Sequence, residues 1–124
     1  IMNETELATL SGDSLSRQFT SQSLNKSLEK ILLTNKQSVI VTLGSQGVYV
    51  YENKTGTLIS GLDVVTVDTT GSGDCFVGAL ATQYLVHGNL VDAAYFANKA
   101  AALSVTKKGA SASMPSLEEV VNLI

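Results

Sequence analysis

Residues 67–79 read VDTTGSGDCFVGA, and this stretch decides the fold. A β-branched run precedes a turn with two glycines, and after Thr70 the apolar residues recur at helical spacing. Glycines let a backbone approach a ligand closely, and the first N–H groups of a helix have no partner inside the helix. The order of strand, glycine turn and helix therefore predicts an anion site at the start of a helix that runs to about His87.

The glycine turn fits neither of the common nucleotide-binding loops. No lysine follows the glycines, which excludes a Walker A loop, and Phe76 stands where a dinucleotide-binding fingerprint has its third glycine. Asp74 is unusual because a carboxylate in the first helical turn repels a phosphate. It could be a base that accepts a hydroxyl proton during phosphoryl transfer, or an acid that complements the helix dipole. The residues alone leave both interpretations open.

The segments before this stretch predict an α/β fold. Ser21–Asn35 spaces its leucines along one face of an amphipathic helix. Ser38–Leu43 is a β-branched run, which is typical of a buried strand in a parallel sheet. Further short strands, expected to be antiparallel and near a sheet edge, are predicted at Val48–Glu52, Thr57–Leu62 and Val64–Val67, with turns at Gly44–Gly47 and Asn53–Gly56.

The segments after the glycine turn are expected to be helical. Asn89 is a credible N-cap for Leu90–Thr106, whose many alanines are typical of a buried helix. Ser116 and Glu119 have the spacing of a capping box for a last helix that reaches Leu123. No proline-rich linker separates these segments, so we treat the chain as one unit.

Composition limits the classes of function. The chain has 124 residues, 8 of them basic and 11 acidic, and 44% hydrophobic residues provide for a core. The basic residues are scattered, which argues against nucleic acid and anionic membranes as partners. The longest apolar stretch, Cys75–Val86, is too short to span a bilayer. One cysteine and one histidine form neither an internal disulfide nor a usual zinc site, and we expect a cytoplasmic protein.

The amino end suggests a fragment of a longer protein. Ile1 precedes Met2, and the next residues are typical of a helix start with no strand before it. Asn3 and Glu6 lie three apart, so both side chains face the same way on a helical turn. Taken alone, this pair favours an ordinary cap.

Residues 68–74, DTTGSGD, with Phe76, Gly78 and Ala79 after them, resemble the carboxy-terminal signature of the ribokinase-like (PfkB) family of sugar and nucleoside kinases. Three more segments match that family in order: Asn3–Glu6, Thr42–Gly47, and Val105–Ala110 with Ser113 and Pro115. The resemblance implies a three-layer α/β/α sandwich. Residues 1–124 would be its carboxy-terminal, ATP-binding and catalytic part, without the amino-terminal sugar-binding part and lid.

The resemblance also implies an activity, which is the ATP-dependent phosphorylation of a sugar hydroxyl. Ribose, phosphorylated at its 5-hydroxyl, is the expected substrate. Asp74 would be the catalytic base that contacts the sugar, and Gly71, Ser72 and Gly73 would form an anion hole for the γ-phosphate. The nucleotide pocket would be lined by Asn3, Thr42, Leu43, Gly44, Ser45, Gln46, Gly47, Gly73, Asp74 and Asn98. For Asn98, the alternative is a polar residue at a helix surface.

Two cations are implied in the same way. Asn3 and Glu6 match a pattern that helps to hold Mg²⁺ and phosphate. A monovalent cation, generally potassium, would be ringed, mostly by backbone carbonyls, by Asp68, Thr70, Ser104, Lys107, Gly109 and Ser113. The alternative for these six residues is a plain loop.

Nothing in this chain matches the family's sugar pocket or its lid, through which members usually form homodimers. We therefore expect a chain without a complete sugar site, inactive when alone. The residues leave open a fructokinase, a nucleoside kinase, a nucleotide-binding module without catalysis, and an α/β domain that binds no nucleotide.

Overall fold

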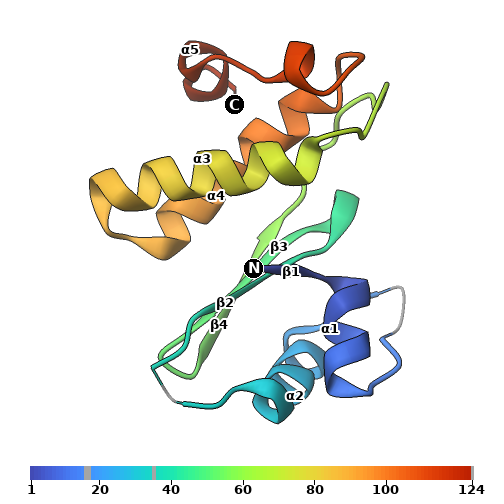
Figure 1. Ribbon diagram of the computed structural model, residues 1–124, viewed down its shortest axis with the longest axis vertical. Coiled ribbons are helices and arrows are strands. Elements are labelled where there is room, and N and C mark those ends of the chain that lie inside the picture. The colour runs from blue at the N-terminus through green and yellow to red at the C-terminus, as the bar shows by residue number, and fades with distance from the viewer. Residues whose placement is uncertain (16–17, 35, 124) are drawn as a thin grey trace. The chain divides into compact units, whose positions relative to one another are not determined.

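The computed structural model describes residues 1–15, 18–34 and 36–123, and Figure 1 shows its helices and strands. The sequence suggested a single unit, but the chain divides into two compact units, Ile1–Ser60 and Gly61–Ile124. Each unit contains a hydrophobic cluster of its own.

The first unit is a four-stranded mixed sheet with two helices. Its strands lie in the order β1 (Met2–Asn3), β2 (Val39–Thr42), β3 (Gly47–Glu52) and β4 (Thr55–Ser60). β1 runs parallel to β2, whereas β3 is antiparallel to both β2 and β4. Val39, Ile40 and Val41 are all buried, which confirms the predicted buried strand, but the sheet around it is mixed and not parallel as predicted.

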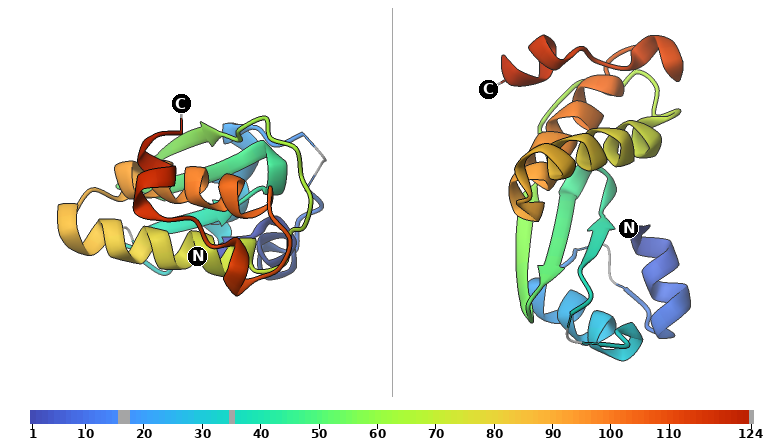
Figure 2. Two further views of the ribbon diagram at one scale, coloured as in Figure 1. Left: turned by 90° about the horizontal axis from the view of Figure 1, so that it is seen from above. Right: turned by 60° about the vertical axis from the view of Figure 1, so that its left-hand side comes forward.

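The two helices of this unit, α1 (Glu4–Ser11) and α2 (Ser21–Ile31), lie on one face of the sheet (Figure 2). Leu24 and Leu28 of α2 are fully buried in a cluster with alternate residues of β2 and β3. Successive side chains of a strand point to opposite faces, so one face receives these leucines. α2 ends at Ile31 because the backbone of the next residue, Leu32, is extended. The predicted end, Asn35, lies outside the described residues.

The strand β1 corrects the expectation that no strand precedes the first helix. Met2 and Asn3 pair in parallel register with Val41 and Thr42. Two residues are too few to show the period of two by which a strand is recognised in a sequence. Asn3 therefore ends a strand and caps a helix at once.

The hairpin between β3 and β4 is tighter than expected. Asn53 and Lys54 both have positive φ angles, 51° and 61°, as the two central residues of a type I′ turn require. The predicted turn covered four residues. β4 therefore begins at Thr55 and ends at Ser60, two residues before each predicted limit.

The second unit is made of helices and loops. Its helices are α3 (Ser72–His87), α4 (Leu90–Ser104), the 3₁₀ turn η2 (Ser111–Ser113) and α5 (Leu117–Val121). α3 and α4 form a helical hairpin, and Asn89 caps α4 as predicted by accepting from the Asp92 N–H at 3.0 Å. The capping box of α5 is confirmed too. α4 and α5 each end two residues before their predicted limits.

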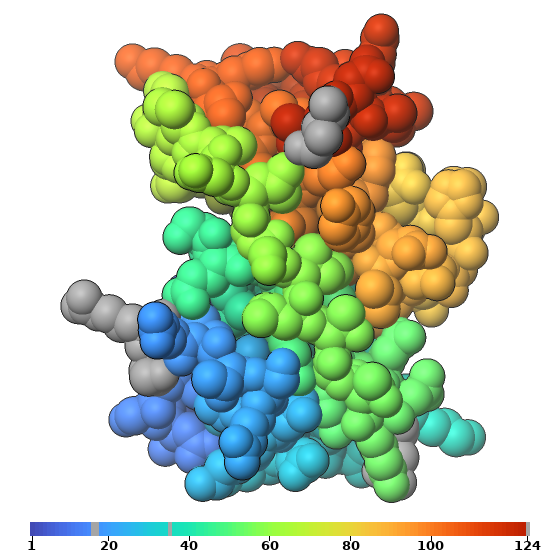
Figure 3. Space-filling view, turned by 180° about the vertical axis from the view of Figure 1, so that it is seen from behind, coloured from blue at the N-terminus to red at the C-terminus, as the bar shows by residue number. Residues whose placement is uncertain are grey.

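The predicted strand Val64–Val67 is wrong. The backbone N–H groups of Val67 and Asp68 both donate to the carbonyl of Val105, at 2.7 and 3.1 Å, and this acceptor follows α4 rather than lying in a strand. Val65 and Val67 are exposed, and their yellow-green segment lies at the surface in Figure 3. β-branched residues favour a strand only where a neighbouring strand completes the pairing.

The helices in the described ranges include none that is both long enough and apolar enough to cross a membrane.

Candidate functional site

The glycine turn opens α3 as the sequence predicted. Gly71 is the N-cap, with a left-handed backbone at φ 77°, and none of the described side chains caps the helix. A Cβ atom on Gly71 would lie 3.1 Å from the Cβ of Ala110. Backbone angle and packing therefore both require glycine at this position.

Two backbone amides at the start of α3 are available to a ligand. The Ser72 N–H donates to the carbonyl of Thr69 at 3.2 Å, and the Cys75 N–H donates to the carbonyl of Gly71 at 2.9 Å. Within the described part of the chain, the N–H groups of Gly73 and Asp74 have no protein acceptor. Free amides at the positive end of a helix dipole attract anions. Of the three predicted anion-hole residues, Ser72 is thus engaged in the turn.

Gly73 differs from Gly71 in what surrounds it. A Cβ atom on Gly73 would meet nothing within 4 Å, so the packing of the chain does not require glycine there. The residue is exposed in the first turn of α3, beside the two free amides. The absent side chain leaves room for a bound group to approach the backbone closely.

The Asp74 side chain is exposed in the first turn of α3. Among the residues that the structure describes, no donor or cation contacts its carboxylate. A carboxylate without partners is free to accept a proton from a group placed beside it. The neighbouring Cys75 is buried, and burial raises the pKa of its thiol, so this position offers no reactive thiolate.

Asp68, at the other end of the turn, accepts hydrogen bonds at both of its carboxylate oxygens. Its Oδ1 accepts from the backbone N–H of Thr70 at 3.0 Å and from the Thr70 hydroxyl at 2.7 Å. Its Oδ2 accepts from the N–H of Gly109 at 2.9 Å, across 41 residues of sequence. These hydrogen bonds, that of Gly109 foremost, lower the pKa of Asp68 from 3.8 to about 2. No local pattern indicated this long-range bond, although the family resemblance placed Asp68, Thr70 and Gly109 around one cation.

The residues assigned to a monovalent cation all belong to the second unit, and the hydrogen bonds of Asp68 bring three of them together: Asp68, Thr70 and Gly109. Ser104 and Ser113 are buried. Their hydroxyls donate to main-chain carbonyls within the same turn, at 2.8 and 2.7 Å.

The Lys107 ammonium is also occupied, because it pairs with Glu119 at 2.7 Å. Only its carbonyl remains for a cation. The described residues contain no group of three or more His, Cys, Asp or Glu side chains that could hold a metal ion. A cation here would therefore depend on backbone carbonyls and the Asp68 carboxylate, which are oxygen donors that suit a hard cation.

In the first unit, Asn3 and Glu6 form a reciprocal capping box at the start of α1. The Asn3 Oδ1 accepts from the Glu6 N–H at 2.8 Å, and the Glu6 Oε2 accepts from the Asn3 N–H at 2.8 Å. The structure thus shows the cap that the pair favours when taken alone. Their contact with Mg²⁺ and phosphate stays a prediction.

The predicted nucleotide segment, Thr42–Gly47, runs from the last residue of β2 to the first residue of β3 in the same unit. Gly44–Gln46 forms a 3₁₀ turn (η1), and Gly47 has φ 110° and ψ −135°, a conformation that is essentially restricted to glycine. The Leu43 N–H donates to the Gly47 carbonyl at 2.9 Å, which closes the turn. Gly44, Ser45 and Gln46 are exposed.

Asn98 lies on α4 of the second unit. The residue is only 9% exposed, so the alternative of a polar residue at a helix surface is wrong. Ala97, directly before it, and Ala100, two residues after it, are buried as well.

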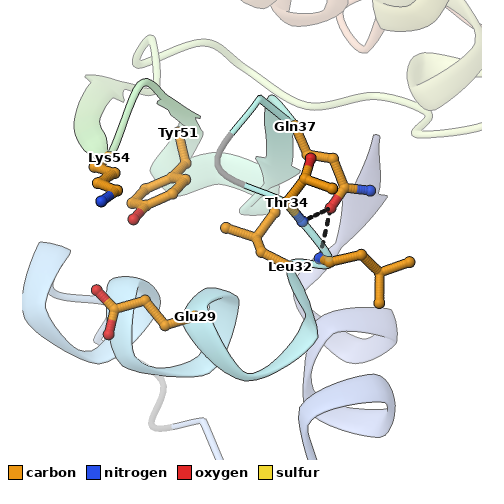
Figure 4. Close-up of a pocket in the computed structure, with 7 residues that line it drawn as sticks. Glu29, Leu32, Thr34, Gln37, Tyr51 and Lys54 are labelled. Atoms are coloured by element: carbon orange, nitrogen blue, oxygen red, sulfur yellow. Dashed lines mark hydrogen bonds between the residues drawn. The ribbon is translucent and has the colours of Figure 1, made fainter.

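A cavity of about 350 Å³ in the first unit contains none of the predicted site residues. It is lined by Glu29, Leu32, Leu33, Thr34, Gln37, Tyr51 and Lys54 (Figure 4). The Gln37 Oε1 accepts from two backbone N–H groups, at 2.6 and 3.1 Å, and so keeps its side chain in place. Tyr51 pairs with Val39, the first residue of β2. The predicted nucleotide segment begins at Thr42, the last residue of that strand. The cavity therefore lies at the opposite end of β2.

A model of the pfkB family of carbohydrate kinases matches residues 1–117. This chain belongs to the pfkB family. Ribokinase from Staphylococcus aureus (strain COL) is 39% identical over 121 residues, which are 97% of this chain and 39% of that enzyme. The chain thus matches about two fifths of the length of that enzyme.

Solved structures of pfkB-type kinases share the fold. Ribokinase from Arabidopsis thaliana, complexed with ribose and ATP, superposes with a TM-score of 0.83 at 32% identity, over 96% of this chain and 38% of that one. A fructokinase double mutant from Vibrio cholerae O395, in a form bound to fructose, ADP and a potassium ion, gives 0.77 at 29% identity, over 96% and 38%. The fold is therefore a fragment of the ribokinase-like α/β fold, as the sequence predicted.

Proposed function

We propose that the full-length protein transfers the γ-phosphate of ATP to a sugar hydroxyl, and that its sugar is ribose, phosphorylated at the 5-hydroxyl. Membership of the pfkB family supports the reaction class, and similarity to ribokinases supports the sugar. One observation carries the assignment to this chain. Asp74 presents an exposed carboxylate beside two backbone amides, and none of these groups has a partner among the residues described, which is the pairing of a base with an anion site.

In the proposed reaction, a carboxylate oxygen of Asp74 accepts the proton of the sugar hydroxyl. The hydroxyl oxygen forms a bond to the γ-phosphorus, and the bond from that phosphorus to the bridging oxygen of ADP breaks. The N–H groups of Gly73 and Asp74 donate to the oxygens of the phosphoryl group while negative charge is spread over them. Gly71 contributes because its left-handed backbone sets the direction in which α3 starts, and with it the direction of these amides.

The nucleotide contacts are assigned from the family resemblance. Thr42–Gly47 would contact ATP through the backbone of a glycine turn, and Asn98 would lie beside the adenine. Mg²⁺ bound with ATP would neutralise phosphate charge, with Asn3 and Glu6 assisting. The carboxylate of Asp68 and the carbonyls of Thr70, Lys107 and Gly109, together with Ser104 and Ser113, would hold potassium.

A fructokinase is the nearest rival to this proposal, favoured by the similarity to a fructokinase bound to fructose, ADP and potassium. The same site residues would also suit a nucleoside kinase, or a nucleotide-binding module without catalysis. We further propose that the protein is cytoplasmic and that it forms a homodimer. Light scattering of the full-length protein would test the homodimer.

Release of ADP by the full-length protein tests the function. The assay contains ATP, Mg²⁺ and potassium, with ribose, fructose, adenosine or no acceptor. We expect release with ribose that falls when potassium is replaced by a larger cation. Release with another acceptor would change the substrate and keep the mechanism. ATP binding by calorimetry, with no release for any acceptor, would contradict the kinase and favour the binding module.

A further inference from the structure

Four backbone N–H groups and one hydroxyl connect the glycine turn to itself and to the loop after α4. The Val105 carbonyl accepts from the N–H groups of Val67 and Asp68, and the Asp68 carboxylate accepts from Thr70 and Gly109. Both oxygens of Asp68 are therefore occupied by donors of this chain.

These bonds act on the start of α3. Gly71 follows Thr70 directly and packs against Ala110, which follows Gly109 directly. Asp68 is bonded to Thr70, directly before Gly71, and to Gly109, directly before Ala110. It therefore fixes the two backbone segments that meet where Gly71 packs against Ala110. The first turn of α3, with Gly73 and Asp74, begins at that contact.

We propose that Asp68 is a positioning residue, whose carboxylate clamps Thr70 to Gly109 and thereby aims the amides and the base at the start of α3, with or without a bound cation. This inference rests on the proposed function and goes beyond it, because a cation ligand and a clamp respond differently to potassium.

The clamp is testable by amide hydrogen exchange, followed by NMR in the full-length protein with tetramethylammonium as the only monovalent cation. In the wild type we expect protection of the Gly109 and Thr70 amides. Asp68→Ala should speed exchange at both by about tenfold or more, because each amide loses a charged acceptor. Asp68→Asn keeps one side-chain oxygen, so the Thr70 amide should stay protected from exchange and the Gly109 amide should lose its protection. Asp63→Asn, at an exposed position of the same loop, is the control and should change neither.

Turnover supplies the second measurement. At saturating potassium we expect Asp68→Asn to keep a lowered kcat with little change in the KM for ATP. The reason is that the variant misplaces the amides and the base at the start of α3 and does not weaken cation binding. Unchanged exchange at Gly109 in both Asp68 variants would overturn the clamp. So would a kcat that saturating potassium restores to the wild-type value. The exchange measurement needs neither sugar nor ATP, so it decides the clamp even if the protein phosphorylates no acceptor.

Discussion

Two aspartates flank the glycine turn, six residues apart, and their surroundings are opposite. Asp68 accepts three hydrogen bonds and links segments that are distant in sequence, whereas Asp74 is exposed and contacts no donor among the described residues. The same kind of side chain thus serves two purposes. A carboxylate whose two oxygens accept hydrogen bonds from backbone groups holds that backbone in place, whereas one whose oxygens accept none can take a proton.

The largest effect should come from the free carboxylate. Asp74→Asn in the full-length protein removes the base and keeps the shape, so we expect kcat to fall by about 10²- to 10⁴-fold. Steady-state release of ADP measures this, with Asp63→Asn as the matched control that keeps wild-type turnover. Turnover within about twofold of wild type would mean that Asp74 only complements the helix dipole.

The two glycines between the aspartates sharpen the comparison. Gly71→Ala should lower the free energy of unfolding by about 1–2 kcal/mol, because its φ of 77° is unfavourable for alanine and its Cβ would press on Ala110. Gly73→Ala has open space around its Cβ and should raise that free energy by up to about 1 kcal/mol. Urea denaturation measures both changes.

In the same pair, activity should separate from stability. The methyl group of Gly73→Ala occupies space beside the free amides, so we expect turnover to fall by about tenfold or more although the protein is no less stable. Equal stability of the two variants would show that the contact with Ala110 does not constrain the turn. Wild-type turnover of Gly73→Ala would place the anion elsewhere.

The smallest effect concerns a second engaged carboxylate outside the turn. Glu119 accepts from Lys107 and from the Ser116 N–H, and these contacts, Lys107 foremost, lower its pKa from 4.5 to about 2. Its stabilisation is therefore complete above about pH 4.5 and is lost as the pH falls towards 2.

Glu119→Gln keeps a residue that can complete the capping box but removes the titration. We expect the variant to lose less stability than the wild type between pH 5 and about 2, as thermal unfolding would measure. Parallel stability curves for the two proteins would contradict this role of Glu119.

The sequence predicted those parts of the fold whose signals are local. The β-branched run of β2, the leucine spacing of α2 and the caps Asn89 and Ser116 each lie within a few residues of the structure that they specify. α3 began where the glycine turn indicated. Such patterns report backbone preference and the burial of one face, which short segments determine by themselves.

Long-range features could not be predicted in this way. β1 exists only because β2 lies beside it, and Val64–Val67 is not a strand because its backbone donates to a carbonyl 38 residues away, at Val105. The bond from Gly109 to Asp68 has no local pattern at all. The burial of Asn98 likewise depends on how α4 packs, and the sequence left it open.

A single-turnover experiment tests the role of Asp74 most directly. Full-length Asp74→Asn is loaded with ATP, mixed with the sugar that the wild type uses, and quenched at intervals, while calorimetry gives its affinity for ATP. We expect an ATP affinity within about twofold of wild type, and almost no sugar phosphate in the time in which the wild type completes one turnover. Sugar phosphate formed at the wild-type rate would contradict the assignment of Asp74 as the base.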